Sequence, residues 1–229
     1  MATSARRSRI GVVVGLRAEA RCLAGLNVAI GCSGARPERA RAEAARLVAA
    51  GAAGLVSFGL AGGLSPALRA GDLVLAAAVW SGGRPIATDA AWRGRLAAAL
   101  GSHLQACEGA LAGSDRLLPS SAAKAALHRT SAACAVDMES HLVAEAASRA
   151  GLPFLVVRAL ADASSQEIPA AARHALGPDG AVRAAAVLGG LLRRPQDLAG
   201  LLRLGRDSAR GLATLRRVAA LAPPDLAFR

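Results

Sequence analysis

The chain has no tyrosine, three phenylalanines and two tryptophans among its 229 residues, and Lys124 is its only lysine. Single-stranded nucleic acids are usually bound on stacked aromatic side chains, so this scarcity of rings argues against nucleic acid as a partner. No apolar run reaches the roughly 18 residues of a transmembrane helix. The basic N-terminus is followed by a short, strand-like apolar run at residues 10–16 without a cleavage site, so we expect no signal peptide.

The four cysteines form no Cys-x-x-Cys pair, and the four histidines have no metal-ligand spacing relative to acids or cysteines. This pattern argues against both a disulfide framework and a zinc site, and it fits a reducing compartment. We therefore expect a cytoplasmic protein with no metal ion and no organic cofactor.

The formal net charge of +12 favours an anionic partner, such as phosphate or an acidic membrane surface. A general preference for arginine over lysine is the simpler explanation of this net charge. The distribution is more informative, because arginines outnumber acids most clearly between residue 183 and the C-terminus.

Short apolar runs alternate with alanine- and arginine-rich segments of helical character, which predicts an α/β sheet protein. Strands are expected over residues 10–15, 26–33, 54–58, 72–80, 110–112 and 153–162, and helices over 37–50, 91–100, 120–129 and most of the chain beyond 170.

Two carboxylates are candidates for a site at the sheet edge. Asp162 ends the apolar run 153–162, and Glu139 stands where a helix follows a short strand. Open α/β sheets bind ligands outside the carboxyl ends of their strands, so both acids are expected to face one substrate. Taken singly, Asp162 could be a helix N-cap and Glu139 a complement to a helix dipole.

The glycine-rich segment Gly59-Leu-Ala-Gly-Gly-Leu64 follows a predicted strand. Backbone N–H groups in such a turn can approach an anion closely. Its spacing matches neither the dinucleotide fingerprint nor a Walker A loop, and a purely structural turn is an equally good interpretation.

The segment Ser121-Ala-Ala-Lys124 matches the Ser-x-x-Lys of penicillin-binding enzymes. Neither a Ser-Asp-Asn nor a Lys-Thr-Gly companion is present, so we attribute the match to chance.

Four segments together resemble the nucleoside phosphorylase and methylthioadenosine nucleosidase superfamily. Residues 58–75 are similar to its Gly-Ser-Ala-Gly-Gly-Leu segment and following Gly-Asp strand, and Gly113-Ser-Asp115 to its Ser-Gly-Asp turn in reversed order. Val136-Asp-Met-Glu139 is similar to Val-Glu-Met-Glu, and Val157-Arg-Ala-Leu-Ala-Asp162 to Val-Arg-Ala-Ile-Ser-Asp. The resemblance implies a three-layer fold in which helices flank a central mixed sheet.

The resemblance also implies roles for individual residues. Asp162 would be the catalytic residue that shares a proton with N7 of the purine, while Glu139 would accept hydrogen bonds from the ribose and Met138 would pack against it. A carboxylate near the sugar stabilises an oxocarbenium-like transition state, and a proton donor at the base helps it to leave. Leu117 and Leu118 would enclose the base. The positions implied around a phosphate are Gly15, Arg17, Ser33, Gly34, Gly59 and Leu60.

The chain departs from the family pattern at three positions. Leu60 and Ala161 stand where the family has serine, and Leu117 stands where it has a stacking aromatic residue. The segment after the first strand holds one acid, Glu19, between two arginines. Arginines suit phosphate better than a neutral water, which favours phosphorolysis, although Glu19 leaves hydrolysis open.

Beyond Asp162 the sequence leaves the nucleosidase pattern. Its Leu-Leu-Arg-Arg-Pro and Leu-Leu-Arg-Leu-Gly-Arg-Asp-Ser segments resemble the hopanoid-associated phosphorylase branch. We therefore divide the chain into a catalytic domain, 1–176, and a basic amphipathic helical extension, 177–229. The extension is expected either to lie on an anionic bilayer or to pack on the domain or a partner subunit. Its apolar positions are Leu198, Leu201, Leu202, Leu212, Leu215, Val218 and Leu221.

The resemblance implies release of adenine from adenosylhopane, a lipid-linked purine nucleoside, with inorganic phosphate as co-substrate. It further implies a homo-oligomer. We expect this protein in the cytoplasm, either free or attached to the inner face of the cytoplasmic membrane. Hydrolysis of the same nucleoside or of methylthioadenosine is the alternative reaction. A non-catalytic, membrane-associated nucleoside-binding protein is the alternative from another class.

Overall fold

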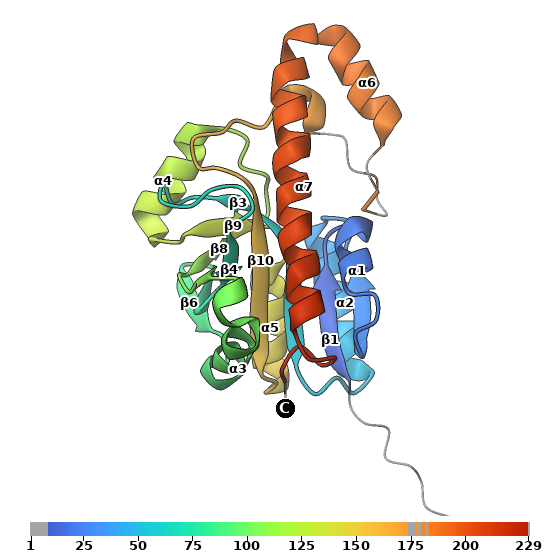
Figure 1. The fold of residues 1–229 in the computed structure, drawn as a ribbon, viewed down its shortest axis with the longest axis vertical. Coiled ribbons are helices and arrows are strands. Elements are labelled where there is room, and N and C mark those ends of the chain that lie inside the picture. The colour runs from blue at the N-terminus through green and yellow to red at the C-terminus, as the bar shows by residue number, and fades with distance from the viewer. Residues whose placement is uncertain (1–8, 174–176, 178–179, 182, 229) are drawn as a thin grey trace, which may run out of the picture.

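The computed structural model describes residues 9–173, 177, 180–181 and 183–228. These residues form one mixed ten-stranded sheet with helices on both of its faces (Figure 1). The strand order is β6-β5-β8-β9-β3-β10-β4-β7, and β1 pairs with both β2 and β3. The predicted α/β class, with a central mixed sheet between helical layers and a helical C-terminus, is confirmed.

The strands are β1 (Ile10–Val14), β2 (Val28–Cys32), β3 (Leu55–Gly63), β4 (Leu73–Leu75), β5 (Ala78–Ser81), β6 (Arg84–Ala87), β7 (Ala106–Cys107), β8 (Leu111–Gly113), β9 (Ala135–Asp137) and β10 (Phe154–Asp162). The helices are α1 (Arg17–Cys22), α2 (Pro37–Ala49), α3 (Ala90–Leu100), α4 (Ser121–Ser131), α5 (Ser140–Ala150), α6 (Ala184–Arg193) and α7 (Leu198–Leu221).

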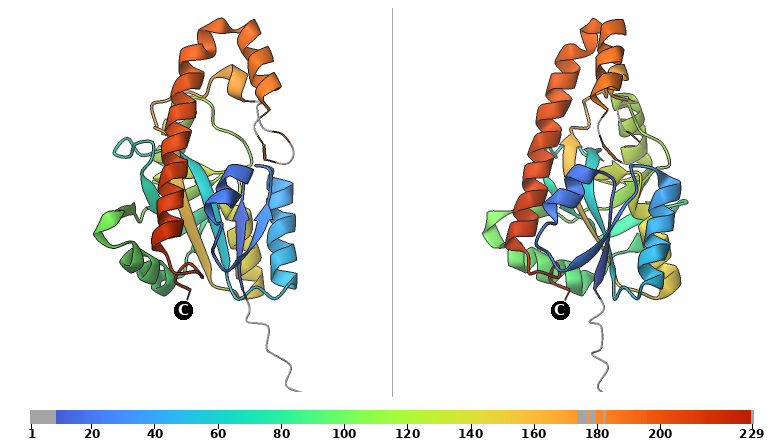
Figure 2. Two further views of the ribbon diagram at one scale, coloured as in Figure 1. Left: turned by 45° about the vertical axis from the view of Figure 1, so that its right-hand side comes forward. Right: turned by 90° about the vertical axis from the view of Figure 1, so that its right-hand side faces the viewer.

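Alternate side chains of β10 point to opposite faces of the sheet, as the two-residue period of a strand requires. Leu155 and Val157 pack in the cluster formed with α1, α3 and α7. Phe154 and Val156 pack in the cluster formed with α2 and α5. The strand is therefore apolar on both sides, which explains its continuous hydrophobic sequence. Figure 2 shows α7 on one side of the sheet and α2 on the other.

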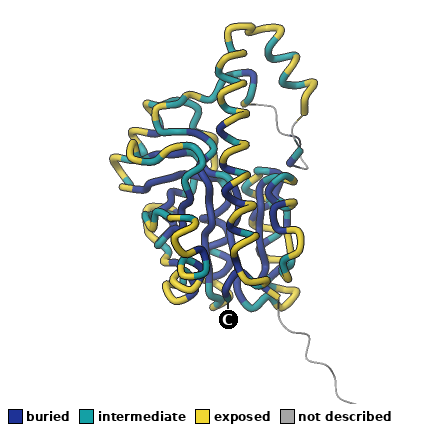
Figure 3. Tube along the Cα trace, in the orientation of Figure 1, coloured by how far each residue is buried: buried dark blue, intermediate teal, exposed yellow. Residues whose placement is uncertain are grey.

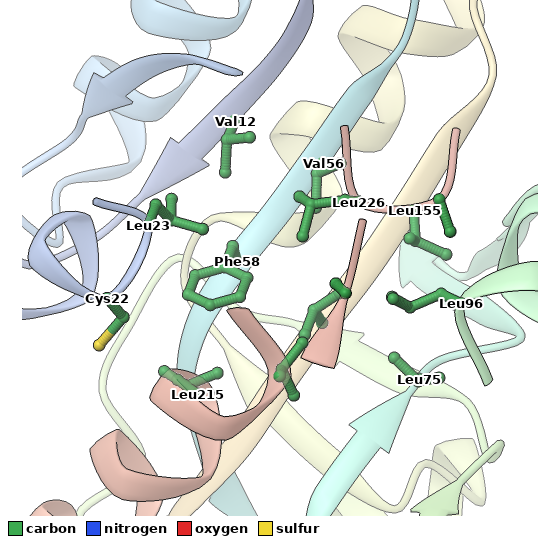
Figure 4. Packing of buried hydrophobic residues seen from close by; sticks show 14 of the residues in the cluster. Val12, Cys22, Leu23, Val56, Phe58, Leu75, Leu96, Leu155, Leu215 and Leu226 are labelled. Atoms are coloured by element: carbon green, nitrogen blue, oxygen red, sulfur yellow. The ribbon is translucent and has the colours of Figure 1, made fainter. Parts of the chain in front are cut away.

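The end of the chain belongs to the core. Leu226 is fully buried beside Leu96 and Leu155 in the cluster of Figure 4. The Trp92 indole Nε1 donates a hydrogen bond of 2.8 Å to the carbonyl of Leu226, and the ring of Phe228 meets that of Trp92 edge to face, with centroids 4.8 Å apart.

Helix α7 has two parts with different surroundings. Its C-terminal part packs on the sheet, where Leu215 and Val218 are buried. Its N-terminal part and α6 project together beyond the sheet, and much of their surface is exposed (Figures 1 and 3). The extension expected over 177–229 therefore combines a projecting hairpin with a segment of the core.

Several predicted elements differ from the observed ones. The expected turn at Gly59–Leu64 is wrong, because β3 continues through Gly63 and pairs there with β9 and β10. The single strand expected over 72–80 is also wrong, because two strands, β4 and β5, occupy this segment. They are separated at Ala76 and Ala77, whose carbonyl groups accept hydrogen bonds from the Thr88 hydroxyl. Helix α1 and the short strands β6 and β7 were not predicted. The helix expected to start at 170 begins as a short 3-10 turn, and residues 174–176 and Pro178 lie outside the described residues.

Candidate active site

Glu19 lies in the first turn of α1, directly after β1. Its carboxylate accepts hydrogen bonds from the backbone N–H groups of Gly15 at 2.8 Å, Leu16 at 2.7 Å and Leu60 at 2.7 Å. Burial raises the pKa of Glu19, while Arg158 and these N–H groups oppose the rise. This acid joins the end of β1 to the middle of β3.

Arg158 is fully buried in the middle of β10. Its guanidinium forms ion pairs with Asp137 at 2.6 Å and Glu139 at 3.2 Å, and donates to the Ser57 hydroxyl at 2.7 Å. Burial disfavours its charge, but the neighbouring carboxylates outweigh that effect and raise its pKa. A charge in so apolar a strand needs such partners.

Glu139 lies at the start of α5, where the Asp137 carboxylate accepts a hydrogen bond of 3.0 Å from the backbone N–H of Ser140. Burial raises the pKa of Glu139 to about 8, although Arg158 opposes the shift. A Cβ atom added to Gly15 would lie 2.9 Å from Glu139 Oε1 and 3.4 Å from Glu19 Oε2. The turn after β1 therefore closes on both carboxylates. We call Glu19, Asp137, Glu139 and Arg158 the acid cluster.

Asp162 ends β10 after an irregularity that shifts its pairing onto Gly62 of β3. Its side chain is 4% exposed and forms an ion pair with the ammonium group of Lys124. Burial raises the pKa of Asp162, while Lys124 and the backbone N–H of Gly63 oppose the rise. Asp162 Oδ1 lies 3.2 Å from the position of a Cβ added to Gly62, so the glycine leaves room for the carboxyl group.

Glu19 of the acid cluster and Asp162 both contact β3. Glu19 is bonded to Leu60 of β3, and Asp162 pairs with Gly62 two residues further on. Two residues of a strand span about 7 Å. The β3 positions that Glu19 and Asp162 contact are therefore neighbours on one strand.

The residues expected around the base and the sugar have different surroundings. Leu118 packs against the small cluster that contains Leu64 and Val136, whereas Leu117 is 42% exposed. Met138 is half-buried between Asp137 and Glu139.

The positions expected around a phosphate have different surroundings. Arg17 is exposed on α1. Ser33 is buried, and its hydroxyl accepts a hydrogen bond from the N–H of Ala35 at 3.2 Å. A Cβ added to Gly180 would lie 2.7 Å from the Gly15 carbonyl and 3.3 Å from Gly34 Cα, so the chain passes directly over both glycine turns.

The expected positions Gly59 and Leu60 instead adjoin the acid cluster. The backbone N–H of Leu60 is bonded to Glu19, and a Cβ added to Gly59 would lie 2.6 Å from both Arg158 Nη1 and Glu19 Oε1. A side chain at position 59 would separate these two groups.

Sequence reasoning missed the contributions of Lys124, Arg158 and Asp137. Each carried a signal: Lys124 is the only lysine, Arg158 interrupts an apolar strand, and Asp137 precedes a predicted helix. Within the described parts of the chain, no three His, Cys, Asp or Glu side chains gather in a way that could hold a metal ion.

The family model of the phosphorylase superfamily matches residues 13–193, which include both Glu19 and Asp162. The chain therefore belongs to the phosphorylase superfamily. No protein with a curated description matches it significantly in sequence.

Solved structures share the fold at low sequence identity. Futalosine hydrolase of Helicobacter pylori has a TM-score of 0.68 at 16% identity, over 93% of this chain and 97% of its own. The 5′-methylthioadenosine/S-adenosylhomocysteine nucleosidase of H. pylori has a TM-score of 0.67 at 16% identity, over 93% of this chain and 98% of its own. The corresponding nucleosidase of Neisseria meningitidis has a TM-score of 0.68 at 16% identity, over 92% of this chain and 98% of its own.

Proposed function

We propose that the chain is a nucleosidase that hydrolyses the N-glycosidic bond of a purine nucleoside and releases adenine. The observation that carries this proposal is that Glu19 of the acid cluster is bonded to Leu60 of β3 while Asp162 pairs with Gly62, two residues further along that strand. A sugar that develops positive charge would lie against the carboxylates, and the departing base against a proton donor.

In this reaction a water oxygen bonds to C1′ as the bond from C1′ to N9 breaks. The electron pair of the broken bond stays on the base, which takes a proton at N7 from Asp162. The proton released by the water passes to the acid cluster. Glu139, whose pKa is about 8, accepts a proton only in its ionised form, which is the minor form at neutral pH, so we assign the acceptor to the acid cluster as a whole. Glu139 would also accept hydrogen bonds from the ribose, with Met138 against the sugar and Leu118 near the base.

The charge of the acid cluster favours water over phosphate as the nucleophile. It has three carboxylates for one guanidinium, and Arg158 is already paired with two of them. A phosphate dianion placed there would have to compete with these carboxyl groups for Arg158. The sequence-based preference for phosphorolysis depended on Arg17 and Arg21, both of which are exposed. Phosphorolysis is therefore our second candidate.

For the substrate we keep the lipid-linked nucleoside adenosylhopane, with methylthioadenosine as the alternative. Support comes from the hairpin of α6 and the N-terminal part of α7, where Leu188, Leu192, Leu198 and Leu202 are exposed. Arginines lie among them, and leucine with arginine suits an anionic bilayer surface. None of the described helices is long and apolar enough to cross a bilayer. From the exposed leucines and arginines we propose peripheral attachment to the inner face of the cytoplasmic membrane, in a homo-oligomer.

The test measures adenine release from adenosylhopane and methylthioadenosine with and without phosphate. Mass spectrometry of the sugar product distinguishes a free ribosyl group from a phosphoribosyl group. We expect full activity in phosphate-free buffer and a free ribosyl product. Activity that requires phosphate would establish phosphorolysis, and binding of both nucleosides without turnover would establish a non-catalytic binding protein.

A further inference from the structure

We propose that Lys124 is a positioning residue for Asp162. It holds one carboxyl oxygen and stabilises the carboxylate that remains after Asp162 gives its proton to the leaving base. This role rests on the proposed function, because the proton transfer takes place only if a purine nucleoside is cleaved at this site.

The ammonium group of Lys124 has no donor left for a ligand. Its side chain is 1% exposed. Besides pairing with Asp162 Oδ2, it donates to the carbonyl of Ala163 at 3.0 Å and to that of Gln166 at 2.9 Å. Three acceptors use all three N–H groups of a lysine. Lys124 therefore acts through Asp162 and not directly on the base.

These contacts also fix the chain around the acid. Both carbonyl acceptors belong to the loop that follows β10, so Lys124 links α4, this loop and the end of the strand. The backbone N–H of Ile168 donates to the carbonyl of Pro119 at 2.9 Å and adds a second link between the loop and the approach to α4. With Oδ2 held by Lys124, Oδ1 is the oxygen beside Gly62 and is the one we assign to the base.

The charged side chains with the largest effect on Asp162 are Lys124 from α4 and Asp207 from α7. Asp207 is itself paired with Arg210 at 2.9 Å. From β3, the backbone N–H of Gly63 also favours the carboxylate. Lys124 is a positive group in direct contact with the acid.

This arrangement makes a buried acid able to give up its proton. As the bond from C1′ to N9 breaks, the proton on Oδ1 moves to N7 and leaves a carboxylate away from solvent. An isolated buried carboxylate is strongly disfavoured. The adjacent ammonium group offsets part of that penalty, and water returns the proton before the next turnover.

The experiment compares Lys124→Met, Lys124→Arg, Asp162→Asn and the double variant Lys124→Met/Asp162→Asn. Arg129→Met is the matched control, since it removes a positive charge from an exposed position of the same helix. The probes are methylthioadenosine and adenosine, and kcat and KM are measured from about pH 5 to pH 9, which brackets general acid–base catalysis at neutral pH.

We expect Lys124→Met to lower kcat by about tenfold to hundredfold with a smaller change in KM. Without the neighbouring cation, the acid holds its proton to higher pH, so the alkaline limb of kcat/KM should move upward by about one unit or more. Lys124→Arg should restore the wild-type position of this limb, and Arg129→Met should leave the rate and the limb unchanged. An unchanged limb in Lys124→Met would overturn the role, even if the rate fell.

Thermal unfolding of the same variants tests the pair without any substrate. Removing one partner of a buried ion pair is strongly destabilising, whereas removing both costs much less than the sum. We expect the double variant to unfold at about the temperature of the less stable single variant. If the decrease in unfolding temperature of the double variant equalled the sum of the two single decreases, Lys124 would not act on Asp162. Wild-type protein that releases no adenine would reject the proposed function, while this cycle would still report on the pair.

Discussion

At the scale of single residues, the acid cluster is dominated by the balance between burial and charge pairing. Three carboxyl groups share one guanidinium, and all four side chains are buried. Arg158 compensates only part of the negative charge, so burial keeps Glu139 protonated at a pH where a surface glutamate is ionised. A protonated carboxyl group of this kind can form hydrogen bonds with a hydroxyl of a sugar, and it gives up its proton about one pH unit above neutrality.

The raised pKa of Glu139 predicts how the stability depends on pH. Burial raises that pKa from 4.5 to about 8 in the folded protein. Between these values the folded state binds more protons than the unfolded state, so the stabilisation from this group is complete at low pH and is lost as the pH rises toward 8. Glutamine does not titrate. As the pH increases over this window, we expect the melting temperature of the wild type to fall relative to that of Glu139→Gln.

Melting temperatures measured by circular dichroism across this window check the prediction. Glu38→Gln, at an exposed position of α2, is the control, and its difference from the wild type should stay nearly constant. A difference between wild type and Glu139→Gln that did not change with pH would contradict the assignment.

At the scale of elements, β3 is the strand on which the site is assembled. Glycine at position 59 lets Glu19 and Arg158 approach the backbone, and glycine at 62 does the same for Asp162. The strand continues through this segment because β9 and β10 pair with it on its two sides. The glycines thus serve close side-chain approach within a strand, and a turn is not needed.

The segment after α7 closes the core beneath α3, and its anchor is Leu226. This side chain is fully buried, and its carbonyl holds the Trp92 indole. Leu226→Ala should leave a cavity and lower the free energy of unfolding by about 2–5 kcal/mol. Urea unfolding measures the change. Leu221→Ala, which alters a leucine that is 36% exposed, is the matched control and should cost much less; equal losses would mean that the last residues do not seal the core.

At the scale of the whole molecule, the sequence was sufficient for the class of fold, for Asp162 at the end of β10 and for Glu139 at the start of α5. The alternation of apolar runs with helices depends on local periodicity, and Asp162 and Glu139 belong to short motifs. The partners of these acids come from distant elements. Lys124 reaches Asp162 across 38 residues of sequence, and Arg158 reaches Glu139 across 19. Such contacts follow from strand order and the bulge of β10, which the spacing of residues does not encode.

The C-terminal region illustrates the same limit. Leucines at helical spacing predicted an amphipathic segment, and α7 has that character. The pattern did not reveal that Leu215 and Val218 are buried on the sheet while Leu198 and Leu202 project away from it. Only the position of the helix relative to the sheet edge separates these two uses of one leucine stripe.

This separation makes a membrane test possible that leaves the core intact. Removing residues 193–229 would also remove Leu215, Val218 and Leu226, so loss of binding in that truncation would have two explanations. Replacing the exposed leucines 188, 192, 198 and 202 by serine alters only the projecting hairpin. We expect this variant to lose binding to anionic vesicles while keeping its melting temperature and its activity on methylthioadenosine.

The charge contribution is tested on the same vesicles. Interactions between exposed arginines and anionic lipids are screened by salt, so wild-type binding should fall as the ionic strength rises and should be weak on zwitterionic vesicles. Ile30→Ser, at an exposed apolar residue on β2, is the control and should bind as the wild type does. Wild-type affinity in the four-leucine variant would assign the hairpin to contact with another subunit, because exposed leucines that do not enter a bilayer need a different apolar partner.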